Sequence, residues 1–281
     1  MNAMKLGFST LGCPEWGLEE IVRFGREYGY TRVGLRGVKG ELDLVKVPEF
    51  QPAQRAATRA RLQQAGLAPE IVLTSTRLVR ASEAERASGL QSAMEHIDLA
   101  RDLGVPFIRV FGGPRPEGVS HEQACEWTVS GLRKLGDYAS SRGVMPLLET
   151  HDYFCDTGLM SEVMEAAAHS SVGVLWDIHH PFRVAGEPLA KSWRNIAQWV
   201  RFCDVKDSTI DSSARLGYRY VLIGEGDVPI GEALELLRAG GYTGCLSFEW
   251  EKIWHPDLAD AHIAFPDYVR KMRQLLGNCV A

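Results

Sequence analysis

Residues 145–151 read MPLLETH, and residues 173–177 read GVLWD. Both are short apolar runs that end in a carboxylate, Glu149 in the first and Asp177 in the second. Between them, Thr157–Ala168 has apolar residues at the three-to-four spacing that is typical of an amphipathic helix. The order of run, helix and run predicts two parallel strands joined by a crossover helix.

This alternation continues in both directions and fills the 281-residue chain. We predict strands at Lys5–Ser9, Arg32–Arg36, Glu70–Leu73, Phe107–Phe111, Met145–Glu149, Gly173–Asp177, Arg201–Lys206 and Gly244–Glu249. We predict helices at Leu18–Tyr28, Gln51–Gln64, Glu83–Leu103, His121–Ser140, Thr157–Ala168, Leu189–Trp199, Ile230–Ala239 and Ala261–Leu276. Eight such units without an interrupting segment indicate a single (β/α)8 TIM barrel that spans residues 1–281 as one domain. A doubly wound open sheet is the alternative, but Ser9–Pro14 is not the glycine-rich phosphate loop that such a sheet would usually carry.

Composition excludes several functions. The net charge is −5 and there is no long basic run, so the chain has no electrostatic reason to bind nucleic acid or an anionic membrane. No apolar stretch approaches the ~20 residues that span a bilayer, and the N-terminus does not resemble a signal peptide, so we expect a cytoplasmic protein. The six cysteines contain no C-x-x-C pair, which argues against a structural zinc cluster or a disulfide framework.

Two further predicted strands also carry an acid at their C-terminal end. In the eighth, Leu246 and Phe248 suit the helix layer, so alternation sends Glu249 into the barrel. In the seventh, the same reasoning turns Asp204 and Lys206 inward. Barrel active sites are built at this end of the strands.

Four carboxylates would therefore gather at the mouth: Glu149, Asp177, Asp204 and Glu249. Any one of them alone is readily explained as an ordinary loop residue paired with Lys or Arg. Four close carboxylates do not all stay ionised unaided, and their oxygens suit hard divalent cations, so the set favours one bound metal ion. His180 lies within reach of that metal or of a substrate.

Five motifs, on the strands expected of them, resemble the xylose-isomerase-like superfamily of barrels, the sugar phosphate isomerase/epimerase group that includes tagatose 3-epimerase, inosose dehydratase and hydroxypyruvate isomerase. The likeness extends over almost the whole chain. Its motifs are Leu148–His151, Asp177–His180, Val205–Asp207, Gly224–Asp227 and Ser247–Glu251.

The resemblance implies that Glu149, Asp177, position 204 and Glu249 bind the metal, and that His180 contacts substrate or a second metal. Position 204 departs from the family pattern, because Asp204 stands where a histidine is usual. An all-oxygen site would favour Mn²⁺ or Mg²⁺ over Zn²⁺. Weakened metal binding, or His180 acting as the nitrogen ligand, are the alternatives.

The resemblance further implies an isomerase or epimerase of a sugar, sugar phosphate or polyol, which removes a proton next to a carbonyl through a metal-stabilised enediolate. Glu149 and Glu249 are the expected pair that exchanges the proton. Candidates for holding the substrate are His180, His151, Lys206 and Arg109. For Arg109 a salt bridge is an equal alternative.

Three other functions are alternatives for a barrel of this kind. A dehydratase of an inosose or keto acid would use the same site, and Asp204 keeps open a catalytically silent sugar-binding barrel. A zinc endonuclease of the same fold is disfavoured, because Thr74–Thr76 and Gly112–Gly113 lack its histidines. A homo-oligomer remains open, since Phe265 and Tyr268 suit either an interface or packing of the last helix on the barrel.

Overall fold

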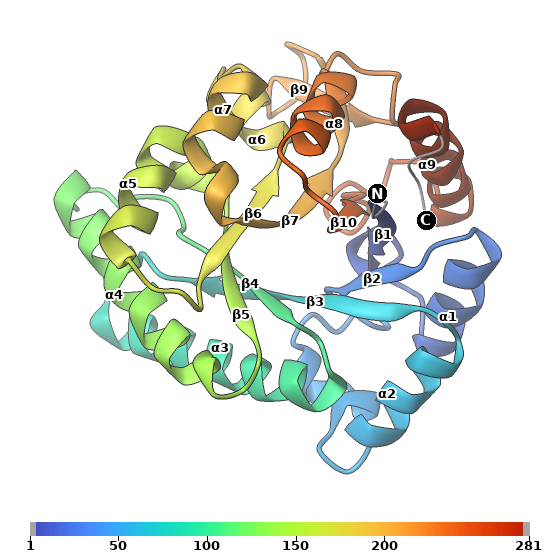
Figure 1. The fold of residues 1–281 in the computed structure, drawn as a ribbon, viewed down its shortest axis with the longest axis horizontal. Coiled ribbons are helices and arrows are strands. Elements are labelled where there is room, and N and C mark those ends of the chain that lie inside the picture. Colours follow the sequence, from blue (N-terminus) through green and yellow to red (C-terminus); the bar gives the residue numbers. More distant parts are fainter. Residues whose placement is uncertain (1–3, 278–281) are drawn as a thin grey trace.

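The computed structural model describes residues 4–277. At its centre lies a closed barrel of parallel strands in the spatial order β1-β10-β7-β6-β5-β4-β3-β2, with helices around it (Figure 1). The barrel strands are β1 (Lys5–Ser9), β2 (Arg32–Leu35), β3 (Ala68–Arg77), β4 (Phe107–Phe111), β5 (Met145–Glu149), β6 (Gly173–Asp177), β7 (Val200–Val205) and β10 (Cys245–Phe248). The predicted TIM barrel is confirmed.

The helices follow the strands in chain order. They are α1 (Leu18–Glu27), α2 (Arg55–Gln64), α3 (Glu83–Leu103), α4 (His121–Ser140), α5 (Thr157–Ala167), α6 (His179–Arg183), α7 (Leu189–Ile196), α8 (Ile230–Ala239) and α9 (Ala261–Leu276). Single 3-10 turns lie at Thr10–Gly12, Leu44–Lys46, Pro48–Phe50, Asp152–Cys155 and Ala197–Trp199. No helix among residues 4–277 is both long enough and apolar enough to cross a membrane.

Two apolar layers result from the alternation of side chains along each strand. Inside the barrel, a small cluster is formed by Ile71, Leu73, Leu147, Leu175, Phe202 and Cys245. The neighbouring residues Cys203, Leu246 and Phe248 belong instead to the large core between strands and helices. The predicted inward and outward faces of β7 and β10 are therefore correct.

Helix α9 packs on the barrel through Phe265 and Tyr268, for which the sequence left open either an interface or a core position. Phe265 and Tyr268 are fully buried. Phe265 contacts the ring of Phe8, and Tyr268 stacks on Phe248 with centroids 4.6 Å apart. Within this chain both residues are therefore core, and they are not exposed interface residues.

Strand β3 is longer than predicted, running from Ala68 to Arg77 where Glu70–Leu73 was expected. The pairing with β4 shifts register between Leu73 and Arg77, as irregularities near active sites often do. The polar run after Leu73 hid this extension, because a strand that leaves the apolar interior loses its apolar signature. The extension carries Ser75 and Arg77 to the barrel mouth.

An antiparallel hairpin beyond β7 was not predicted. It pairs β8 (Asp207–Ile210) with β9 (Tyr218–Val221). The Asp207 carboxylate accepts backbone N–H groups of Gly224 at 2.8 Å and Gly226 at 3.1 Å, which closes the loop that follows β9. These contacts join residues 17 and 19 positions apart, so no local sequence pattern predicts them.

Candidate functional site

Four acids lie at the C-terminal ends of consecutive barrel strands. Glu149 and Asp177 are the last residues of β5 and β6, Asp204 lies near the end of β7, and Glu249 follows β10. All four are at most 4% exposed. Ligand oxygens of Glu149, Asp177 and Glu249 lie within 4.8 Å of one another. With Glu251, we call these five residues the acidic half of the mouth.

The Lys206 ammonium lies among the acids of this half. Its Nζ is 2.5 Å from Glu249 Oε2, 2.7 Å from Glu251 Oε1 and 2.9 Å from Asp177 Oδ2. Burial would lower the pKa of Lys206, but Asp177, Glu249 and Glu251 outweigh it and raise that pKa. Lys206 is thus a permanent cation that neutralises part of the acidic half.

Asp204 has no such partner. It is fully buried, and neither carboxylate oxygen has a hydrogen-bond partner among the described residues. Burial, followed by the charges of Glu249 and Glu149, raises the pKa of Asp204 well above its ordinary value. Burial likewise raises the pKa of Asp177 to about 7, although Lys206 opposes the shift. Metal-free, this half therefore holds carboxyl groups that resist ionisation.

The two expected proton-transfer residues each contact one cation. Arg109 Nη1 lies 2.5 Å from Glu149 Oε2, and the guanidinium also stacks on Phe111 at 3.9 Å. Burial raises the pKa of Glu249, but Lys206 and Arg109 more than offset this and lower it. Glu249 is therefore ionised at neutral pH and able to accept a proton.

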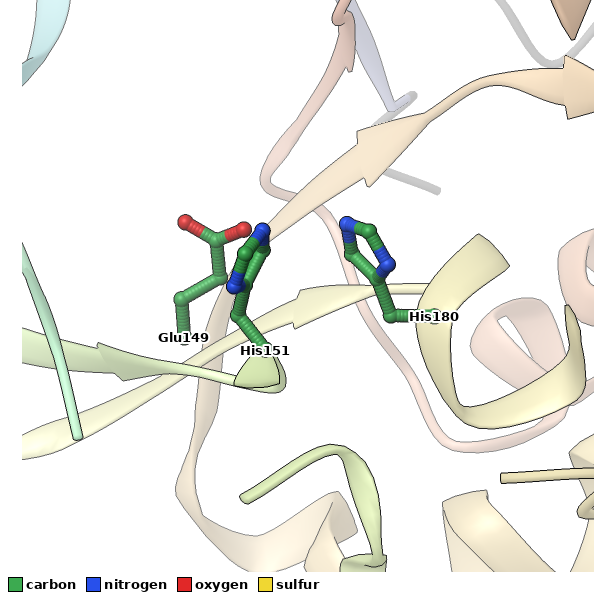
Figure 2. A group of neighbouring side chains, drawn as sticks. All are labelled: Glu149, His151 and His180. Atoms are coloured by element: carbon green, nitrogen blue, oxygen red, sulfur yellow. The ribbon is translucent and has the colours of Figure 1, made fainter. Parts of the chain in front are cut away.

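The histidines surround this cluster. Figure 2 shows the side chains of Glu149, His151 and His180 directed to the same side, from the end of β5, the turn after it and α6. The rings of His151 and His180 are 4.3 Å apart, and His180 Nε2 lies 3.1 Å from Asp177 Oδ2. Burial and Lys206 lower the pKa of His180, so its ring is neutral and able to bind a cation.

His179, in contrast, contacts the β8–β9 hairpin. Its ring is buried, lies 2.8 Å from Ser208 Oγ and packs on Tyr218 and Tyr220 of the β9 strand. His179 thereby fixes the hairpin against the mouth.

A divalent cation fits these residues. Oxygens of Glu149, Asp177 and Glu249 lie within 4.8 Å of one another; the oxygens of Asp204 lack hydrogen-bond partners among the described residues, but Asp204 belongs to none of the candidate ligand groups. Two further groups of candidate ligands combine carboxylate oxygens with imidazole nitrogens: Glu149 with His151 and His180, and Asp177 with His179 and His180. Because both all-oxygen and mixed nitrogen–oxygen donor sets are present, the geometry accepts a hard cation as well as zinc.

A cavity of about 350 Å³ opens beside these groups. On the acidic side its walls include Glu149, Glu249, Glu251 and His151. Sequence reasoning missed the remaining polar lining, Arg36, Ser75, Arg77 and Arg80. Arg36 directly follows an apolar strand. The acids were identified by the same sequence signal, so this signal could also have identified Arg36.

Comparisons with known proteins agree with this architecture. The sequence profile of the xylose isomerase-like TIM barrel family matches residues 22–269. No curated protein matches the sequence.

Several solved structures superpose along nearly the whole chain. The IolI protein with a bound zinc atom has a TM-score of 0.82 and 17% identity, covering 98% of this chain and 99% of that one. An L-ribulose 3-epimerase gives a TM-score of 0.79 and 16% identity, covering 98% and 95%. The probable 3-DHS dehydratase AsbF of Bacillus anthracis gives 0.78 and 17%, covering 96% and 98%. At these identities the likeness shows the shared fold.

Proposed function

This chain belongs to the xylose isomerase-like TIM barrel family, and we propose that it is a divalent-metal-dependent isomerase or epimerase of a sugar or polyol. The observation that carries the proposal is the convergence of Glu149, Asp177 and Glu249 within 4.8 Å beside a substrate-sized cavity. Sugar epimerases share the fold, which supports the reaction class. The expected cation is Mn²⁺ or Mg²⁺ because carboxylate oxygens predominate.

In this proposal the protein's own residues move one proton. Glu249, held ionised by Lys206, takes the proton from the carbon next to the substrate carbonyl, and Glu149, in its protonated form, gives a proton to the other face of that carbon; proton exchange with solvent restores both carboxyl groups. Arg109 keeps Glu149 in place through their 2.5 Å contact. A bound divalent ion would supply Lewis-acid stabilisation of the negative charge that develops on the carbonyl oxygen. His151 lines the cavity, His180 lies beside it, and both suit substrate hydroxyls or the metal.

A second candidate is dehydration at the same site. It begins with the same proton abstraction and then needs an acid for the departing hydroxyl. His151 lines the cavity, and although burial opposes it, Asp152 and Glu149 raise the pKa of His151. A histidine that is readily protonated there favours a dehydratase as the alternative.

The experiment compares native protein with Glu249→Gln. We expect about one metal ion per native chain by elemental analysis and exchange of a substrate carbon-bound hydrogen with deuterated water. In the variant we expect exchange to fall by about 10²–10⁴-fold while the circular dichroism spectrum is kept. Glu232→Gln, an exposed position on α8, is the matched control. Near-native exchange in Glu249→Gln refutes the assignment, and no metal binding with retained sugar binding indicates a silent barrel.

A further inference from the structure

The cavity beside the acidic half has a second wall of opposite charge. Arg36 follows β2, Arg77 ends β3, Arg80 lies just beyond it and Arg109 is in β4, and all four line the cavity. We call these four arginines the basic half of the mouth. A neighbouring cavity of about 690 Å³ shares Ser75, Arg77 and Arg80 with it. These shared residues join the two cavities at the basic half.

Two of these arginines are already paired with acids. Arg109 contacts Glu149 at 2.5 Å, and Arg77 Nε lies 4.0 Å from Asp152 Oδ2. Their charges are therefore at least partly used by the protein itself.

Arg36 and Arg80 differ, because neither forms an ion pair within residues 4–277. Arg36 is only 6% exposed and donates to neutral oxygens, Leu42 O at 3.2 Å and Ser75 Oγ at 2.9 Å. A guanidinium stays charged at neutral pH, and burying one without a counterion costs free energy. Such a group is expected where a ligand supplies the missing negative charge.

The position of the remaining acids limits where that ligand lies. In the smaller cavity the carboxylates are Glu149, Glu249 and Glu251, all in the acidic half. The larger cavity carries Glu41, Asp43 and Glu85, so its outer part repels anions. The most favourable place for an anion is therefore the smaller cavity at its Arg36 and Arg80 end.

We propose that the substrate carries a compact oxyanion, a carboxylate or a phosphate, which Arg36 and Arg80 bind while its carbonyl faces Glu149 and Glu249. The planar guanidinium matches both groups with paired hydrogen bonds. A cavity of about 350 Å³ suits a small sugar acid or sugar phosphate. This inference rests on the proposed function, since it assigns the substrate class of the same site.

The test uses matched pairs of probes that differ only in the anionic group. D-glucuronate is compared with D-glucose, and D-fructose 6-phosphate with D-fructose, by isothermal titration with and without Mn²⁺. We expect the anionic member of at least one pair to bind about tenfold or more tightly than its neutral partner. Which pair responds distinguishes a carboxylate from a phosphate.

Variants connect that preference to the arginines. Arg80→Gln is the principal variant because Arg80 is half-buried and its side chain makes no hydrogen bond or ion pair among residues 4–277. We expect it to weaken anion binding about tenfold, and Arg36→Gln to weaken it at least as much if it folds. Arg238→Gln, exposed on α8, is the control and should bind like native protein.

Equal binding of anionic and neutral probes, or native anion binding by Arg80→Gln, overturns the inference. Either result leaves the proposed function standing if the protein holds metal and exchanges hydrogen with neutral sugars. Conversely, anion binding that depends on Arg80, in a protein without metal or exchange, upholds this inference and refutes the proposed function.

Discussion

Each half of the barrel mouth contains charged or ionisable groups that lack a partner of opposite sign among the described residues. In the acidic half these are carboxyl groups, and in the basic half they are guanidinium groups. In the acidic half, one lysine contacts Asp177, Glu249 and Glu251, while Asp204 has no partner among the described residues. In the basic half, Arg36 and Arg80 have no acidic partner within the described chain. The excess negative charge is buried and crowded, whereas the excess positive charge is spread over a partly open wall.

This difference indicates different roles for the two halves. Crowded buried carboxylates store unfavourable energy that a cation relieves, so the acidic half should respond strongly in stability to any change of charge. Arg80 makes no side-chain hydrogen bond or ion pair among the described residues, so its substitution should alter binding more than stability. The predictions below test this contrast in decreasing order of expected effect.

The largest effect is expected for Lys206→Met. Removing the ammonium leaves the buried carboxylates of Asp177 and Glu249 and the partly buried one of Glu251 uncompensated, so the free energy of unfolding in EDTA should fall by about 3–5 kcal/mol. Urea denaturation measures it, and Mn²⁺ should restore part of the loss. Lys134→Met, exposed on α4, is the control. A loss below ~1 kcal/mol would mean that the acids are neutralised by protons instead.

The next effect concerns pH. Burial raises the folded-state pKa of Asp177 to about 7 from 3.8, so its contribution to stability is complete below pH 3.8 and is lost as pH rises through about 7. Asp177→Asn lacks this loss. Between pH 4 and pH 7.5 in EDTA, the native protein should therefore lose about 3–4 kcal/mol relative to the variant. Parallel pH profiles from urea denaturation would show that Asp177 titrates normally.

A smaller gain is expected for Asp204→Asn. The neutral amide removes a buried, unpartnered carboxylate, so the metal-free protein should be stabilised at pH 7 by about 1–2 kcal/mol. The same variant should bind Mn²⁺ more weakly by titration calorimetry. Asp257→Asn, exposed in the loop before α9, provides the comparison. Destabilisation without loss of metal affinity would assign Asp204 a purely structural role.

The smallest effect is expected for Arg80→Gln, whose free energy of unfolding should stay within about 0.5 kcal/mol of native. Arg80 has no ion pair to lose within the described residues. Urea denaturation checks this. A loss above ~1 kcal/mol would show that the arginine supports the fold, and the contrast between the halves would then fail.

The barrel and the acidic half were largely predictable because both leave local signals. Leu246 and Phe248 mark the outer face of their strand, and alternation then assigns Glu249 to the interior. The same parity identified Lys206 as inward-facing. It did not show that Lys206 contacts Glu251, because that contact joins residues 45 apart.

The basic half left weaker signals. An arginine at a strand end is compatible with solvent, a salt bridge or a ligand, and Arg109 in fact both pairs with Glu149 and lines the cavity. Arg80 lies in a connection whose path depends on the extended and irregular end of β3. Only the closed barrel brings Arg36 and Arg80 to one wall. That residues 1–281 form a single domain, and the roles of the site residues, stay predictions.

Asp204 has a consequence for how this protein can evolve. Aspartate and histidine codons differ only in their first base, so one base substitution would place an imidazole at position 204. The position is fully buried and holds a side chain without hydrogen-bond partners in the described structure. A single mutation could thus shift the preferred ion from a hard cation towards zinc. Under the proposed metal-binding function, one nucleotide separates an oxygen ligand from a nitrogen ligand at position 204.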